Sequence, residues 1–298
     1  MTTTRVAVPR KGRPLEAVLE RLAARTGTTE LADDIISTLR YEKAVTKDNQ
    51  STDRDVYERL SSYSTLSDPT EPEFSLLRDD RDGMPRRIVF DSVTVPTAAG
   101  DVQLVGREEP FRALRTHEFA LGFDSADLVL EEVVQLRDDP LTSIAEINDR
   151  IDPLDTDVRV VTGLGDTVYH TLLATPEVID SQDRPLDREF VAVYEGNLCI
   201  SPRYERLVEA VLGTAALDGI SFTYPDNGAE EEADIAATGI GVYLTVTGST
   251  ARDHGLELGE QLFPSETVLL ENASERTDAS QAVAELFEAP EATALQSV

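Results

Sequence analysis

A glycine-containing turn near the end of the chain, TVTGSTARDHGL (245–256), has the composition of an anion-binding loop. Residues 241–246 predict a buried strand before it, and a helix is expected to follow. Backbone N–H groups at a helix N-terminus favour a bound anion, and hydroxyl groups add hydrogen-bond donors. The residues concerned are Thr247, Gly248, Ser249 and Thr250. Serine and threonine are also ordinary helix caps, so the turn alone leaves both interpretations open.

A second candidate stretch, RVAVPRKGRPLEAVL (5–19), combines a short strand, a basic turn and the start of a helix. The helix is predicted over 14–26 and ends near Gly27. Lys11 and Arg13 lie in the turn, and cations so placed can stabilise the developing charge of a pyrophosphate. A basic turn exposed to solvent is the alternative.

The charge of the chain restricts its ligands. It carries 57 acidic and 27 basic residues, a formal net charge of −30, and its only lysines are Lys11, Lys43 and Lys47. This balance argues against general nucleic-acid binding, which needs clustered cations. Such acidity resembles the proteins of salt-loving organisms, in which salt screens the self-repulsion. A phosphate site must therefore be built locally.

The remaining composition predicts a cytoplasmic protein that does not cross a membrane. The single cysteine, Cys199, fits a reducing compartment, and no apolar segment is long enough to span a bilayer. The three histidines, His117, His170 and His254, are scattered, so we expect no metal site made of side chains alone.

Strands and helices alternate along the chain, which predicts an α/β fold with a largely parallel sheet and ligands at the carboxyl ends of strands. Residues 42–72 are polar and predict a surface insertion with one helix over 53–63. We further expect strands over 127–133 and 189–196, and a strand that runs through glycines into a helix over 157–173.

Several stretches, in this order, resemble the ATP phosphoribosyltransferase family. They cover about half of the chain. The two most specific are the VPRKGR turn and the loop TGSTARDHGLEL, which is similar to the family's phosphoribosyl-pyrophosphate loop. The others are DSVTVPTAAGDVQLVGREEP (91–110), FALGFDSADLVLEE (119–132), LCISPRYERLVEAVLG (198–213) and SETVLLEN (265–272).

The resemblance implies an α/β, two-lobed periplasmic-binding-protein-like (type II) fold with a cleft between the lobes. Lobe 1 is expected at 1–105 plus 259–298, and lobe 2, which carries the phosphate loop, at 106–258. The implied reaction transfers phosphoribosyl from phosphoribosyl pyrophosphate to N1 of ATP, or of a related nucleotide, with Mg²⁺. This is the first step of histidine biosynthesis. The short catalytic form without a regulatory domain is expected, and a homo-oligomer is compatible with it.

The resemblance also assigns roles to individual residues. The turn from Thr247 to Thr250 would hold the 5′-phosphate, while Lys11 and Arg13 would face pyrophosphate or the phosphates of ATP. The supporting residues would be the cations Arg203 and Arg252 and, as a cleft-wall or hinge residue, Asp101.

Tyr243 marks the main departure from the family, which usually has an acidic residue four positions before the threonine of the loop. The acidic run Glu230 to Glu232 is a candidate substitute, and Glu108 is the acid that follows Gly106. The long segments 42–72 and 131–190 have no counterpart. A non-catalytic or differently specific binding or sensor protein for a phosphorylated metabolite on the same fold is therefore the alternative, and a binder of a non-phosphorylated anion is a third possibility.

The net charge leads to a prediction about stability. Transfer from high salt to low ionic strength should lower the melting temperature, because the screening of the repulsion between carboxylates is lost. Circular dichroism melts across a salt series measure it. A melting temperature independent of salt would contradict this view of the acidity.

Overall fold

The computed structural model describes residues 3–47, 49–65, 67–78, 87–225 and 231–288. The chain divides into two compact units. Unit 1 consists of 1–124, 157–166 and 267–298, and unit 2 of 125–156 and 167–266. The lobe boundaries and the cleft expected from the sequence stay predictions. Among the described residues, no helix is both long and apolar enough to cross a membrane.

Unit 1 is built on a seven-stranded sheet of order β2-β3-β4-β1-β5-β12-β6. The strands are β1 (Thr3–Pro9), β2 (Glu73–Leu77), β3 (Arg87–Thr97), β4 (Gly100–Arg107), β5 (Leu121–Ser125), β6 (Val158–Gly163) and β12 (Thr267–Asn272). Strand β1 runs parallel to β4 and β5, whereas β2–β3, β3–β4 and β12–β6 are antiparallel. The sheet is therefore mixed, and the expectation of a largely parallel sheet is wrong for this unit.

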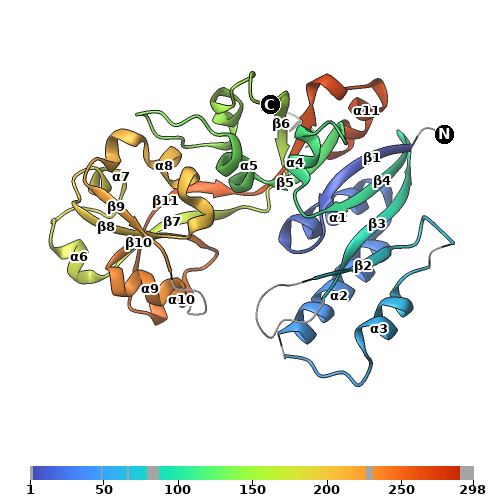
Figure 1. The fold of residues 1–298 in the computed structure, drawn as a ribbon, viewed down its shortest axis with the longest axis horizontal. Helices are drawn as coiled ribbons and strands as arrows, with labels where there is room; N and C mark the ends of the chain where they lie inside the picture. Colours follow the sequence, from blue (N-terminus) through green and yellow to red (C-terminus); the bar gives the residue numbers. More distant parts are fainter. Residues whose placement is uncertain (1–2, 48, 66, 79–86, 226–230, 289–298) are drawn as a thin grey trace, which may run out of the picture. The chain divides into compact units, whose positions relative to one another are not determined.

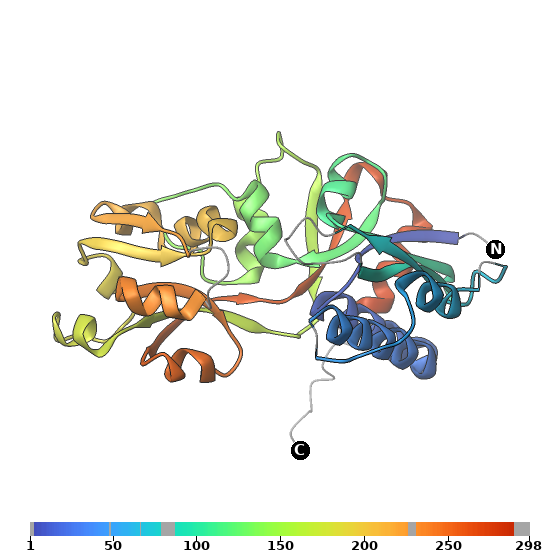
Figure 2. The ribbon, with the colours of Figure 1, turned by 60° about the horizontal axis from the view of Figure 1, so that its bottom comes forward.

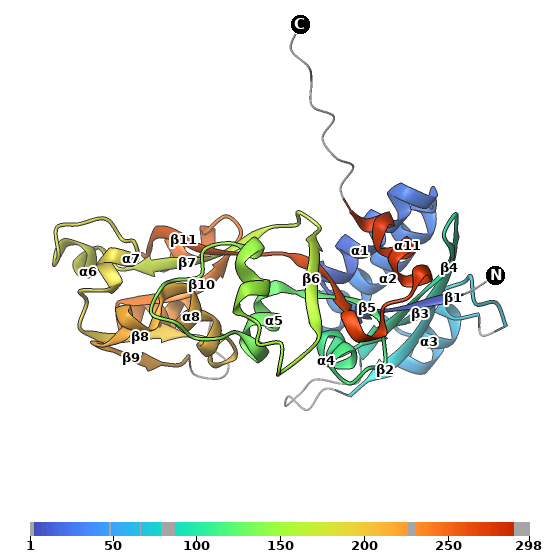
Figure 3. The ribbon, with the colours of Figure 1, turned by 90° about the horizontal axis from the view of Figure 1, so that it is seen from above.

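The core of unit 1 lies on the face of the sheet to which Val6 and Val8 point. Helix α1 (Arg13–Thr26) buries Leu15, Val18, Leu19 and Leu22 there, at the spacing that predicted a helix. The helices α2 (Thr29–Thr46) and α11 (Asp278–Phe287) pack beside α1 (Figures 2 and 3). Helix α4 (Pro110–Arg115) packs on the opposite face, where Leu114 lies against Gly122 and Ala7.

The segment 42–72 contains the predicted helix, α3 (Val56–Tyr63), which begins with a capping box at Asp55. Among the described residues of 47–72 only Arg59 is buried, so this part lies at the surface as expected. The guanidinium group of Arg59 donates to the carboxylate of Glu42 at 2.8 and 3.0 Å, and the two side chains are 9% and 2% exposed. The hydroxyl group of Tyr63 donates to the same carboxylate at 3.0 Å. A buried charge pair thus anchors α3 to α2, which the sequence did not reveal.

Unit 2 holds a five-stranded sheet of order β11-β7-β10-β8-β9 (Figure 1). Its strands are β7 (Val168–Ala174), β8 (Gly196–Ile200), β9 (Ile220–Thr223), β10 (Ile240–Thr245) and β11 (Glu257–Ser265). Its helices are α5 (Ala126–Val133), α6 (Pro176–Asp180), α7 (Arg188–Val191), α8 (Glu205–Leu212), α9 (Glu231–Thr238) and α10 (Ser249–Asp253). Strands β8, β9 and β10 run parallel, whereas β7 runs antiparallel to β10 and β11.

The two sheets confirm the predicted α/β, two-lobed periplasmic-binding-protein-like (type II) fold. Strand β12 returns from unit 2 and inserts between β5 and β6, so the chain crosses repeatedly between the units. The segment 131–190 is therefore shared between the two units, since 157–166 belongs to unit 1 and the remainder to unit 2.

Three predictions of local structure in this part of the chain are wrong. The strand expected over 127–133 is helix α5, whose buried residues Ala126, Val129, Leu130 and Val133 follow helical spacing. The helix expected after the glycines of 157–173 is the buried strand β7, and the strand expected over 189–196 is replaced by the end of helix α7 and a turn. Short apolar runs fit helix and strand alike, because a few residues are too short for their period to decide between the two.

The Glu42–Arg59 pair predicts a large loss of stability on substitution. Glu42→Gln leaves the guanidinium group of Arg59 buried without its counter-ion, so the free energy of unfolding should fall by about 3 kcal/mol. Urea denaturation at constant high salt measures it. Arg40→Gln is the matched control, because the pair of Arg40 with Glu16 is exposed on the arginine side and its loss should matter far less. Equal losses in the two variants would show that burial of the pair is irrelevant.

Candidate active site

The turn after β1 is shaped by Gly12, which has φ of +82° and precedes the first residue of α1. A glycine accepts this left-handed conformation without strain, so the chain can reverse directly from the strand into the helix. Lys11 lies at the carboxyl end of β1, and its Nζ is 3.8 Å from Oε2 of Glu108, which follows β4. Because β1 and β4 are parallel neighbours, their carboxyl ends bring this lysine and this acid to one edge of the sheet.

Arg10, the third cation of the turn, is a structural residue. Its Nε donates to the carbonyl oxygen of Phe90 at 3.2 Å, and its Nη2 donates to Oδ1 of Asp91 at 3.1 Å and to the hydroxyl group of Ser75. A side chain at position 106 would meet the same carbonyl oxygen at 2.5 Å, so Gly106 leaves the space that Arg10 occupies. Arg10 thus anchors the turn to β3.

Arg13 is held by a carboxylate of its own unit. Its Nη1 lies 2.6 Å from Oδ2 of Asp166, which follows β6, and it also donates to the carbonyl oxygen of Asp166. The other bonds of this carboxylate come from the backbone N–H of Thr267 at 2.8 Å and from its hydroxyl group at 2.7 Å. Any anion that binds Arg13 must therefore share it with Asp166.

Asp101 lies at the other end of the sheet. It is the second residue of β4 and pairs with Thr3, whereas Pro9 at the end of β1 pairs with Arg107. The six steps along the strand from Thr3 to Pro9, at about 3.3 Å each, place Asp101 roughly 20 Å from the carboxyl end of β1. The structure therefore does not bring Asp101 together with Lys11 and Arg13.

The threonine-rich turn leaves β10 and enters α10 through Gly248, with φ of +68°. A Cβ atom at this glycine would lie 2.3 Å from Cδ2 of Leu258, so no other residue fits without displacing that side chain. Gly248 occupies the N-cap position and has no side chain of its own to cap the helix. Thr247, Ser249 and Thr250 are exposed. The backbone N–H of Ser249 donates to Oγ1 of Thr247 at 3.4 Å, a long bond, so the turn combines a weak side-chain cap with hydroxyl groups that face solvent.

The two predicted supporting arginines occur on the same edge of the sheet of unit 2 as this turn. Nη1 of Arg252 donates to the carbonyl oxygen of Thr247 at 3.0 Å and so braces the turn from α10. Arg203 follows β8, and its guanidinium carbon lies 5.9 Å from the ring centre of Tyr204. Because β8 and β10 are parallel neighbours, Arg203 and the turn both follow carboxyl ends of strands.

Tyr243, which replaces the usual acid, is hydrogen-bonded to a carboxylate. Burial, helped by the nearby charges of Glu231 and Glu232 and by the hydrogen bond to Glu231, raises the pKa of Tyr243 to about 12. Burial also raises the pKa of Glu231 above its usual range, although the hydrogen bond from Tyr243 opposes the rise. The residue suggested by the acidic run is therefore Glu231, at the start of α9, whereas Glu230 lies outside the described residues.

A buried cluster that the sequence did not reveal surrounds Asp127. Nε2 of His170, on β7, lies 3.3 Å from Oδ2 of Asp127, at the start of α5, and both side chains are almost fully buried. Burial disfavours the charged carboxylate, but the hydrogen bond and charge of His170, with hydrogen bonds from Ser125 and Ser265, lower the pKa of Asp127 to about 2. His170 stood out only as one of three scattered histidines, and its partner is 43 residues away.

The predicted site residues thus form two groups, each within one unit. Lys11 and Arg13 lie in unit 1, and Thr247 to Thr250, Arg203 and Arg252 lie in unit 2. In the part of the chain that the structure describes, no three His, Cys, Asp or Glu residues are grouped so that they could hold a metal ion.

The amino-acid sequence matches the family described as halobacterial ATP phosphoribosyltransferase over residues 1–298. A comparison with curated proteins found no match. Similar solved structures include an ATP phosphoribosyl transferase of the HisG:HisZ complex from Thermotoga maritima, with 14% identity over 95% of this chain and 93% of that chain and a TM-score of 0.44. Another is the VFT2 domain of BvgS from Bordetella pertussis, with 11% identity over 97% of this chain and 88% of that chain and a TM-score of 0.41.

The match along the whole sequence defines the class of the protein, which is an enzyme that transfers phosphoribosyl groups. The chain belongs to the family of halobacterial ATP phosphoribosyltransferases, whose reaction is the first step of histidine biosynthesis. The family resemblance, the function and the enzyme class expected from the sequence are thereby confirmed. This reading is supported over the alternative of a non-catalytic binding or sensor protein.

The Asp127–His170 pair makes a prediction about pH. Because the pKa of Asp127 is lowered in the folded state, the pair stabilises the fold above about pH 4 and loses this effect as the pH falls towards about 2. The difference in melting temperature between the unchanged protein and Asp127→Asn should thus be large at neutral pH and shrink below pH 4. Exposed Asp218→Asn is the control and should show no such difference. A gap that stays constant with pH would refute the role of the carboxylate charge.

Proposed function

We propose that the turn from Thr247 to Thr250 binds the 5′-phosphate of phosphoribosyl pyrophosphate. The observation that supports this proposal is the weakly capped start of α10, where Gly248 lets the backbone approach and hydroxyl groups face solvent. Backbone amides need no net positive charge to hold an anion, so such a site suits an acidic chain. Arg252 is the positioning residue, because its bond to the carbonyl oxygen of Thr247 fixes the turn.

In unit 1 we assign Lys11 and Arg13 to the pyrophosphate group or the phosphates of ATP. In the reaction, N1 of adenine supplies an electron pair to the anomeric carbon of the ribose and forms the new C–N bond. The bond from that carbon to the pyrophosphate oxygen breaks, and pyrophosphate leaves with the electron pair. Negative charge accumulates on the leaving group, where fixed cations lower the barrier. No covalent nucleophile of the protein is required, so placement of the two substrates contributes the remainder.

Glu231 and Tyr243 together are proposed to replace the missing acid of the loop. The hydroxyl group of Tyr243 donates a hydrogen bond to Glu231. The phenol oxygen and the second carboxylate oxygen then remain as acceptors for ribose hydroxyl groups. Both residues belong to unit 2, which also carries the turn. The replacement moves the negative charge from the strand to the start of the preceding helix, α9, without removing it from the unit.

Mg²⁺ is implied by the family, and the donors present fit an ion that is held mainly by substrate phosphates and water. Mg²⁺ prefers oxygen ligands and commonly keeps waters and substrate phosphates among them. The described residues hold no three-carboxylate cluster, so the protein would supply at most Glu231 and hydroxyl oxygens of the turn. The ion, when bound, would neutralise phosphate charge, and most of its ligands would come from the substrate and water.

The decisive experiment combines the assay with a variant of the turn. The pure protein in high salt, given phosphoribosyl pyrophosphate, ATP and Mg²⁺, should form phosphoribosyl-ATP. Ser249→Ala with Thr250→Ala should raise the KM for phosphoribosyl pyrophosphate about a hundredfold or more, since each of the two lost bonds to a charged group costs about 1.5–3 kcal/mol. The KM for ATP should not change. Both side chains are exposed, so the fold is retained.

Ser37→Ala is the matched control, because it removes an exposed hydroxyl group from α2 in unit 1. Its kinetic constants should equal those of the unchanged protein. If folded protein binds phosphoribosyl pyrophosphate in calorimetry but forms no product, the assignment of an active enzyme fails for this chain and the binding-protein alternative takes its place.

A further inference from the structure

A cavity of about 530 Å³ lies within unit 1, between the turn after β1, the second half of α2 and the start of β3. All three lysines of the chain line it. Lys43 lies on α2 and Lys47 is the C-cap residue directly after it, in a region that has no counterpart in the family resemblance. The six cationic residues of the lining are Lys11, Arg13, Arg40, Lys43, Lys47 and Arg87. This concentration of positive charge stands against a net charge of −30 for the whole chain.

The two carboxylates of the lining are already neutralised. Glu16 accepts from Nη2 of Arg40 at 2.6 Å. Glu42 is 2% exposed and is bonded to Arg59, which does not line the cavity. These ion pairs neutralise both acids of the wall, and Lys11 lies 3.8 Å from Glu108, which does not line the cavity.

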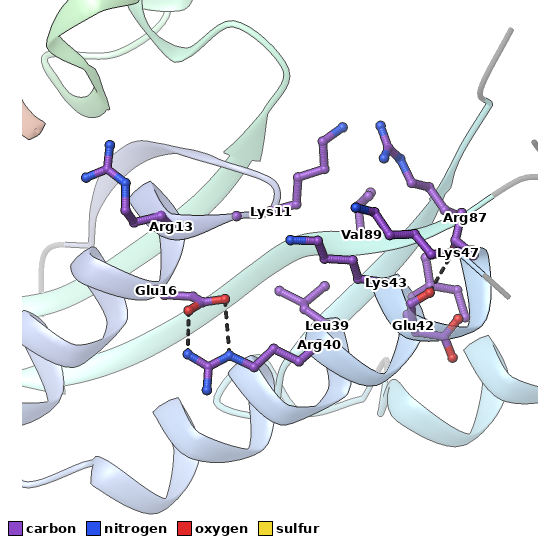
Figure 4. Close-up of a pocket in the computed structure, with 13 residues that line it drawn as sticks. Lys11, Arg13, Glu16, Leu39, Arg40, Glu42, Lys43, Lys47, Arg87 and Val89 are labelled. Atoms are coloured by element: carbon purple, nitrogen blue, oxygen red, sulfur yellow. Dashed lines mark hydrogen bonds and ion pairs between the residues drawn. The ribbon is translucent and has the colours of Figure 1, made fainter. Parts of the chain in front are cut away.

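The charged ends of four side chains face a common space. Figure 4 shows Lys11 reaching in from the turn, Lys43 and Lys47 from the end of α2, and Arg87 from β3, whereas Arg13 points away from them. Lys43 and Lys47 form no salt bridge with any acid in the described part of the chain. The apolar side chains of Leu39 and Val89 lie beneath the lysines.

Like charges gathered in a concave site repel one another unless an anion binds between them. Apolar walls strengthen the local field, because they lower the effective dielectric constant. Lysine is a compact cation with three donors and a common ligand of phosphate groups. Cations arriving from three elements suit an anion with several charges along its length. A long polyanion is disfavoured, since the rest of the surface is acidic.

We infer that this cavity binds an oligophosphate chain, and that Lys43 and Lys47 at the end of α2 are binding residues added to the turn that carries Lys11. The inference rests on the proposed function only in that Lys11 faces substrate phosphates. The phosphate chain can come from two sources, the triphosphate of the nucleotide or the diphosphate of phosphoribosyl pyrophosphate. Helix α2 thereby becomes part of the substrate site.

Calorimetric titration with inorganic tripolyphosphate in high salt tests the binding without turnover. The unchanged protein should bind it, and Lys43→Gln with Lys47→Gln should weaken binding about tenfold or more, because two charge-assisted contacts are lost. Both lysines are exposed, so the variant keeps its core. Arg112→Gln with Arg115→Gln on α4 removes the same charge outside the cavity and should leave the affinity unchanged.

Competition identifies the source of the phosphate chain. Displacement of tripolyphosphate by ATP but not by AMP assigns the cavity to the triphosphate, and displacement by phosphoribosyl pyrophosphate assigns it to the diphosphate. Equal affinity of the Lys43 and Lys47 variant and the unchanged protein, or no competition by either substrate, would overturn the inference. Absence of phosphoribosyl-ATP formation would instead count against the proposed function, since the titration does not depend on turnover.

Discussion

Electrostatic repulsion between an acidic chain and anionic substrates is the constraint on which the design of this protein depends. Acidic residues outnumber basic ones by about two to one, so the average surface repels phosphate groups. A substrate such as phosphoribosyl pyrophosphate can bind only where local structure reverses that average. Two physical effects can make the surface locally attractive to an anion. They are the dipoles of backbone amides and the grouping of a few cations in a concave site.

We propose that the two units use these means separately. Unit 2 carries the amide-based solution, in which Gly248 adopts a left-handed conformation and leaves the start of α10 only weakly capped. Unit 1 carries the cation-based solution, in which Gly12 turns the chain so that Lys11 stands at the edge of the sheet. In both places glycine is required because of backbone geometry, while the polar side chains nearby point outward.

Besides these sites, several carboxylates are paired with a basic side chain of their own unit. Asp166 holds Arg13, Glu42 holds Arg59, and Asp127 is held by His170. The first two pairs place a negative charge beside a cation, and each of the three pairs lies inside one unit. Tyr243 belongs to the same pattern, since it hydrogen-bonds to Glu231 where the family usually has an acid. The change from an acid to Tyr243 therefore rearranges charge within unit 2.

The sequence by itself determined the strand-turn-helix geometry around Gly12 and Gly248, the helix α1, the family and the acidic character, because backbone preferences, helical periodicity and composition act over a few residues. It misjudged α5 and β7, because these apolar segments are too short for their sequence alone to distinguish a helix from a strand. Only the tertiary structure decided that Lys43 and Lys47 join Lys11, that Arg59 pairs with Glu42 across 17 positions, and that His170 meets Asp127. These contacts arise when α2, α3 and the sheets pack together. Packing between distant segments depends on the whole chain, so no local sequence pattern predicts it.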